Sequence, residues 1–158
     1  MKGMRQAHIR RIQDTLIIAG DGVIAFGAWT LVKTALFFSF VNGEQLMQEL
    51  GLDGFPPASL YAVAGVILAI ELSVRAYVGF SARSEGRGKK KGPFYLIVAV
   101  LAALVNMYAA VSTMLGMSIT LSNLDLVVSV IVELTAFLAL AAVLYCSLCL
   151  RHLNKAEG

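Results

Sequence analysis

Four apolar stretches, each long enough to cross a lipid bilayer, constrain this chain to a membrane fold. They lie at about 14–41, 58–80, 93–115 and 124–150. A hydrocarbon core of about 30 Å takes roughly 20 helical residues to cross. The stretches show no strand-like alternation of apolar and polar residues, and unpaired backbone groups are costly in lipid, so we expect helices rather than barrel strands. The mean hydropathy of +0.77 also indicates a membrane class. The sequence therefore predicts an all-α membrane protein with four transmembrane helices in an up-and-down bundle.

The basic residues lie almost entirely on one side of the predicted bundle. All Lys and Arg residues except Lys33 and Arg75 fall within 1–13, 81–92 or 151–158. The loops on the other side contain acidic residues instead, namely Glu44, Glu49, Asp53 and Asp125. Because Lys and Arg in short loops are retained on the cytoplasmic side, we expect cytoplasmic N- and C-termini.

This topology divides the chain into three parts. Residues 1–13 form a basic cytoplasmic N-terminal segment, 14–150 the four-helix transmembrane domain, and 151–158 a cytoplasmic tail. The first apolar stretch is too long for a signal peptide and lacks a small-residue cleavage pattern, so we expect it to be retained. We predict an integral protein of a bacterial cytoplasmic (inner) membrane.

Five ionisable residues fall inside the predicted helices. They are Asp21, Lys33, Glu71, Arg75 and Glu133. A charge near the bilayer centre costs about 2.5 to 3.5 kcal/mol on insertion scales, so we expect these side chains to face one another rather than lipid. Depths estimated from the helical rise pair Asp21 with Arg75, and Lys33 with Glu133. Glu71 lies one turn from Arg75 and close to the midplane, at a depth that Asn106 of the third span also reaches.

This polar cluster has two interpretations. In the functional one, the side chains bind a substrate or ion, or handle a proton, because intramembrane carboxylates commonly mark pathways. The candidate residues for that role are Asp21, Glu71, Arg75, Asn106, Lys33 and Glu133. In the structural one, two ion pairs and a shared carboxylate fix the helix register, or a charge pairs with another subunit. Both agree with the sequence.

The 81–92 segment, SARSEGRGKKKG, combines glycine with a basic run, so we expect it to be mobile and solvated. It fixes the topology, and it is also a candidate docking site for anionic lipid or a soluble partner. The candidate docking residues are Arg83, Arg87, Lys89, Lys90 and Lys91. No aromatic platform accompanies these charges, which argues against nucleic acid as a partner.

Small residues predict close contacts between helices. Gly20 and Gly22 flank Asp21, where they either permit close packing or leave carbonyl groups able to bind an ion. Trp29 lies in the middle of its span, so we expect it to pack within the bundle or between subunits. Four short helices enclose little space, and we therefore expect a homo-oligomer or a subunit of a larger membrane complex.

Catalytic motifs are scarce in this sequence. Cys146 and Cys149 lie late in an apolar span, on a reducing face and without a second cysteine pair, so they do not indicate redox catalysis. Two cysteines also make a poor zinc site, and His8 and His152 lie in terminal segments. We predict no catalytic residue, metal or cofactor, and an enzyme is not the expected class.

The sequence thus favours a small polytopic membrane protein whose buried charged cluster serves transport, channel activity or sensing. The species handled would be a proton, an ion or a small polar solute. The alternative is a non-catalytic membrane subunit or scaffold. In that case the buried ion pairs specify assembly, and the basic loop docks lipid or a soluble partner.

Overall fold

A computed structural model describes residues 2–40, 56–89, 91–116 and 124–155. The acidic residues Glu44, Glu49 and Asp53 lie outside the described residues, as does Lys90, and nothing is described of the Asp125 side chain. The described chain forms four long helices, namely α1 (Lys2–Phe40), α3 (Pro57–Gly86), α4 (Phe94–Gly116) and α5 (Leu124–Lys155).

Each helix contains a segment that is long and apolar enough to cross a membrane. These segments are Gln6–Leu36, Ala58–Gly86, Phe94–Ser112 and Val130–Leu153. The described residues thus confirm the prediction of an all-helical chain with four helices long and apolar enough to span a membrane, which suggests an integral membrane protein. Helix α1 begins at Lys2, well before the predicted start of its span, so the basic N-terminal segment continues the first helix.

Helix α3 extends further than the sequence predicted. The expected end at residue 80 and the expected solvated loop from 81 were wrong, because the helix continues to Gly86. It ends where the amides of Gly88 and Lys89 bond to the carbonyls of Glu85 and Ser84, at 2.9 and 3.1 Å. Gly88 has a φ of +82°, the left-handed conformation that glycine adopts most readily after a helix.

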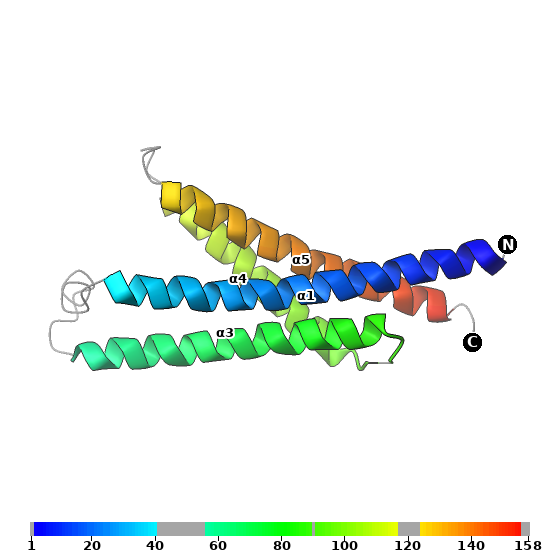
Figure 1. Cartoon of the computed structure of the whole chain (residues 1–158), viewed down its shortest axis with the longest axis horizontal. Helices are drawn as coiled ribbons and strands as arrows, with labels where there is room; N and C mark the ends of the chain where they lie inside the picture. Colours follow the sequence, from blue (N-terminus) through cyan, green and yellow to red (C-terminus); the bar gives the residue numbers. More distant parts are fainter. Residues whose placement is uncertain (1, 41–55, 90, 117–123, 156–158) are drawn as a thin grey trace.

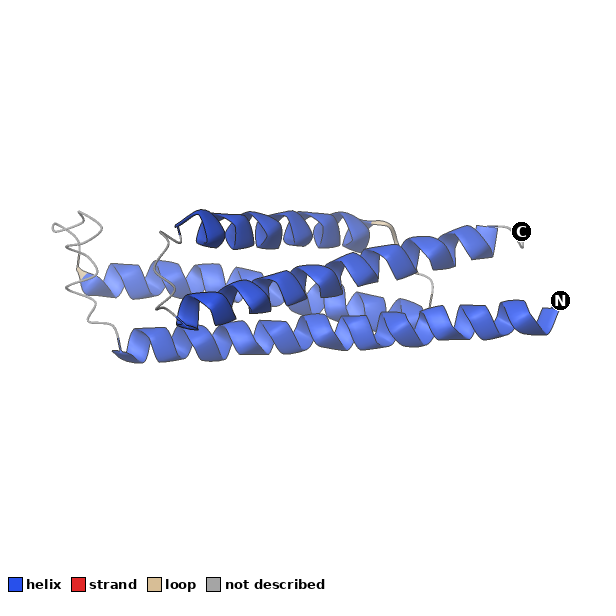
Figure 2. Ribbon diagram, turned by 90° about the horizontal axis from the view of Figure 1, so that it is seen from above, coloured by secondary structure: helices blue, strands red, loops and turns tan. Residues whose placement is uncertain are grey.

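The four helices pack as two pairs that diverge toward one end (Figure 1). α1 lies along α3, and α4 lies along α5. Figure 2 shows that α5 lies between α4 and α1, which joins the two pairs. α1 begins and α5 ends at the same end of the bundle, which we call the terminal end. Toward the opposite end, α4 and α5 lean away from α1 and α3 (Figure 1).

The apolar core lies in the half of the bundle nearer the terminal end. Leu16 and Val23 of α1 meet Val78 of α3, and Leu140 and Val143 of α5 complete the centre of this cluster. Its other buried members are Ala82, Tyr95, Ala99, Ala103, Cys146 and Leu150. Apolar burial is therefore concentrated where the helix pairs meet, and the diverging half depends more on polar contacts.

Glycines set the register of α1 against α3. A Cβ atom on Gly20 would lie 2.8 Å from the carbonyl oxygen of Gly79, and one on Gly79 would lie 2.7 Å from that of Gly20. Only glycine permits this approach of two backbones. Close packing is thus what Gly20 provides, the first of its two predicted roles. Gly22 instead lies toward Ala139 of α5, where a Cβ would make an ordinary contact at 4.0 Å.

Candidate functional site

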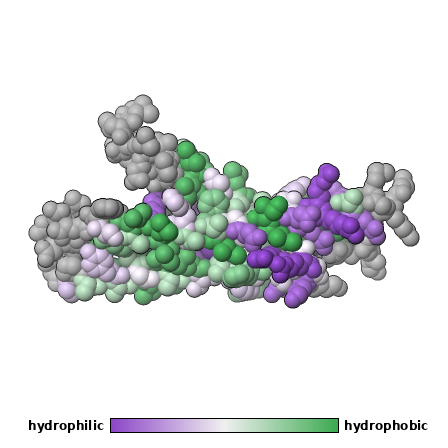
Figure 3. Space-filling view, in the orientation of Figure 1, coloured by the Kyte–Doolittle hydropathy of each residue, from purple (hydrophilic) through white to green (hydrophobic). Residues whose placement is uncertain are grey.

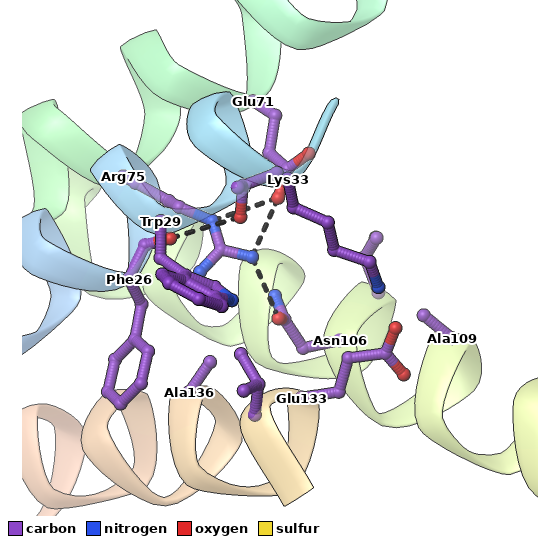
Figure 4. A pocket seen from close by; sticks show the side chains of 12 residues that line it. Phe26, Trp29, Lys33, Glu71, Arg75, Asn106, Ala109, Glu133 and Ala136 are labelled. Atoms are coloured by element: carbon purple, nitrogen blue, oxygen red, sulfur yellow. Dashed lines mark hydrogen bonds and ion pairs between the residues drawn. The ribbon is translucent and has the colours of Figure 1, made fainter. Parts of the chain in front are cut away.

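A cavity of about 220 Å³ lies between the helices (Figure 4). All four helices contribute to its wall. Its polar and ionisable lining residues are Thr30, Lys33, Glu71, Arg75, Asn106 and Glu133. Five of the six candidate site residues predicted from the sequence are therefore brought together here. Asp21 does not line this cavity.

Arg75 is held in the cavity wall by hydrogen bonds to side chains of α3 and α4. Its Nε and Nη2 atoms donate to Oε1 of Glu71 at 2.9 and 2.6 Å, and Nη2 also donates to Oδ1 of Asn106 at 3.0 Å. Asn106 in turn donates to the carbonyl of Ala102 at 2.8 Å. Arg75 and Asn106 are each 7% exposed, so these contacts offset the cost of burying a guanidinium in an apolar span.

The predicted pairing of Asp21 with Arg75 was wrong. Asp21 instead forms an ion pair with Arg83, with 3.4 Å between Oδ1 and Nη1, and both side chains are well exposed. The contact between Gly20 and Gly79 sets the helix register and places Asp21 beside the following turn of α3. The sequence-based depth took Arg83 as the end of its helix, whereas α3 continues beyond it.

Lys33 and Glu133 reach the cavity from facing helices, α1 and α5. Figure 4 shows the amine of Lys33 and the carboxylate of Glu133 directed toward the same space. Their common depth agrees with the sequence analysis, although their direct ion pair stays a prediction. Oε2 of Glu133 is buried and has no hydrogen-bond partner among the described residues. A buried acceptor without a donor costs about 1–3 kcal/mol, so this oxygen favours a proton, a water molecule or a solute that donates a hydrogen bond.

Two aromatic side chains of α1 complete the wall beside Arg75. Phe26 and Trp29 lie next to each other in Figure 4. Trp29 is 46% exposed and is the single tryptophan of the sequence. Trp29 thus lines the cavity within the bundle, but nearly half of its surface is exposed, so it is less buried than the sequence predicted. The fluorescence of Trp29 reports directly on this site.

A second buried polar cluster lies at the terminal end, and the sequence analysis missed it. Its members are Glu85, Tyr95, Ser147 and Arg151, here called the Glu85 network. Ser147 donates to Oε2 of Glu85 at 2.5 Å, the Tyr95 hydroxyl contacts the same oxygen, and Arg151 Nε donates to Oε1 at 3.1 Å. Glu85 is 9% exposed and Ser147 is fully buried.

Arg151 also ties this network to the connection between α3 and α4. Its Nη2 atom donates to the carbonyls of Lys91 and Gly92 at 3.0 and 3.1 Å, and its guanidinium lies 5.7 Å from the ring centroid of Tyr95. Glu85 was overlooked because it stands inside a basic, glycine-rich run. Its spacing of seven residues from Val78, on one helical face, was the available signal.

The basic segment divides into a paired residue and an exposed run. Arg83 is engaged by Asp21, whereas Arg87, Lys89 and Lys91 are exposed. Figure 3 shows hydrophilic residues gathered near the terminal end, with hydrophobic surface over much of the rest of that face. Of the predicted docking residues in the described chain, these three are exposed, whereas Arg83 is partly exposed and paired with Asp21.

The described residues hold no group of three or more His, Cys, Asp and Glu side chains placed to bind a metal ion. Cys146 is a buried free thiol and Cys149 a partly buried one.

No protein-family model matches this chain, and comparison with curated proteins and with solved structures gives no match either. The cavity and its charges are therefore the basis for inferring a function.

Proposed function

We propose that this chain is a bacterial inner-membrane protein that moves or senses a proton or a small polar solute through the cavity between its four helices. The observation that carries the proposal is the buried Oε2 of Glu133, which has no partner among the described residues and adjoins a 220 Å³ cavity inside an apolar helix bundle. Carboxylates at such positions commonly mark ion or substrate pathways.

The cavity residues differ in how firmly each is held, and we assign their roles from that difference. Arg75 and Asn106 form a fixed wall, because each is buried and hydrogen-bonded. The Glu71 side chain is 37% exposed despite its bond to Arg75, so a solute in the cavity can reach it. Glu133 is the acceptor whose interactions in this form are incomplete, and we assign it the exchangeable proton or the solute contact.

The proposed topology is an up-and-down bundle with cytoplasmic termini. In support of it, the exposed basic residues Arg87, Lys89 and Lys91 follow the end of α3 at Gly86, which lies toward the terminal end (Figure 1). Anionic lipid headgroups are the proposed partners of these residues. Apolar side chains cover the outer faces of the helices, and a homo-oligomer or a larger membrane complex is the proposed assembly.

The test is proton flux into proteoliposomes that contain a trapped pH-sensitive dye. The unsubstituted protein should dissipate an imposed pH gradient at least tenfold faster than empty vesicles, and Glu133→Gln should lose that activity. Asp21→Asn, which changes an exposed acid outside the cavity, is the matched control and should keep it. Equal rates for the unsubstituted protein, Glu133→Gln and empty vesicles would reject proton movement.

A non-catalytic scaffold is the second candidate function. It is favoured by the completeness of the Arg75 contacts and of the Glu85 network, which join helices through fully engaged side chains. Under this alternative no flux is expected from the unsubstituted protein, and Glu133→Gln should alter only its assembly, measured by size-exclusion chromatography in detergent.

A further inference from the structure

Tyr95, Ser147 and Arg151 of the Glu85 network all contact the Glu85 carboxylate. Tyr95 comes from α4, Ser147 and Arg151 come from α5, and Glu85 itself stands in the last turn of α3. Arg151 adds the carbonyls of the connection between α3 and α4. One buried acid thus connects three helices at the terminal end.

The network lies on the terminal side of the cavity. Glu85 follows Arg75 by ten residues on the same helix, about 15 Å along its axis. The apolar core, including Cys146, fills the bundle at this level, whereas the helix pairs separate toward the opposite end (Figure 1). In this form the cavity is therefore closed toward the terminal side.

Stability alone is a weak reason for such a cluster. A buried ion pair contributes little net stability compared with apolar side chains of similar volume, and the surrounding core is already well packed. Contacts that form and break as a unit are, however, what a two-state element requires.

We propose that the Glu85 network is the gate at the terminal end of the cavity: intact, it closes the cavity to that side, and broken, it admits solutes from that side. This inference rests on the proposed function, because it assigns a route of access to the same cavity. The gate opens when α5, carrying Ser147 and Arg151, separates from Glu85 of α3.

Two cysteine reporters test the gate. Cys146 is native, 6% exposed and adjacent to the network, and Cys149→Ser leaves it as the sole cysteine. Ala109→Cys, in a Cys146→Ser and Cys149→Ser background, places a thiol in the cavity wall. A membrane-impermeant maleimide is added to one side of oriented membrane vesicles, and protease access to a terminal tag identifies the terminal side.

We expect slow labelling of both reporters from the terminal side while the network is intact. Glu85→Gln should raise the labelling rate from that side at least tenfold and leave labelling of Ala109→Cys from the opposite side unchanged. Asp21→Asn, at the exposed ion pair near the same end, should change neither rate. No increase with Glu85→Gln would overturn the proposal, and so would an equal increase from both sides, which indicates general loosening.

Milder variants keep the test decisive if Glu85→Gln does not fold. Tyr95→Phe and Ser147→Ala each remove a single hydroxyl from the network, and both should raise terminal-side labelling by a smaller factor. Unchanged labelling in both would also overturn the gate.

The gate and the proposed function fail separately. Side-specific labelling without any flux would retain the gate and remove transport. Flux that depends on Glu133, together with a labelling rate that Glu85→Gln does not change, would support transport and reject the gate.

Discussion

At the scale of single residues, the Arg75 contacts show what the sequence could and could not predict. Arg75 is held by Glu71 on its own helix and by Asn106 on α4. The pair four residues apart on one helix could be predicted from the sequence, since such neighbours always share a face. The partner of Asp21 could not, because it depends on how far one helix is shifted along another, and backbone contacts at Gly20 set that shift.

The variant Glu71→Gln separates hydrogen bonding from charge at the Arg75 contacts. Its amide oxygen still accepts from Nε and Nη2 of Arg75, so we expect the protein to assemble normally on size-exclusion chromatography. It removes the negative charge beside Arg75, and we expect flux across proteoliposomes to fall at least tenfold. Normal flux in Glu71→Gln would show that Glu71 serves the structure only. Asp21→Asn again provides the control for loss of an acid outside the cavity.

At the scale of helices, the four spans could be predicted because a bilayer demands long apolar runs. The end of α3 could not be placed from composition, since charge and glycine in the 81–86 segment resemble a loop. Tertiary contacts determine where α3 ends. Glu85 accepts hydrogen bonds from three side chains of α4 and α5, and Gly88 forms the turn after the helix. The missed Glu85 network is a direct result of that misplaced end.

The seam between α1 and α3 gives the prediction at this scale. In Gly79→Ala the new Cβ would lie 2.5 Å from Cγ1 of Ile24 and 2.7 Å from the carbonyl oxygen of Gly20. We expect this overpacking to lower the free energy of unfolding by about 1–3 kcal/mol. Gly65→Ala is the matched control on the same helix, because no atom lies within 4 Å of its Cβ. Unfolding in detergent, followed by circular dichroism, should show a lower free energy of unfolding for Gly79→Ala than for the unsubstituted protein. Gly65→Ala should not lower it.

At the scale of the whole molecule, the length of α3 determines how the chain crosses the membrane. Its candidate span, Ala58–Gly86, has 29 residues and is therefore about 43 Å long, more than the roughly 30 Å hydrocarbon core. A helix of this length can therefore present its two ends on opposite faces of a membrane. The exposed basic residues follow the end at Gly86, and the proposed topology places that end in the cytoplasm because positive charge is retained on the inner face.

A cysteine in the first turn of α3 and another beyond its last residue test this topology in a background lacking Cys146 and Cys149. Lys91→Cys and Ala58→Cys both replace exposed residues, so neither substitution should disturb packing. An impermeant maleimide should label Lys91→Cys in inside-out vesicles and Ala58→Cys in right-side-out vesicles. Labelling of both from one side would contradict a membrane-spanning α3. A reversed pattern would keep the span and overturn only the proposed cytoplasmic assignment, because the span is inferred from the length of α3 and its direction from the basic residues.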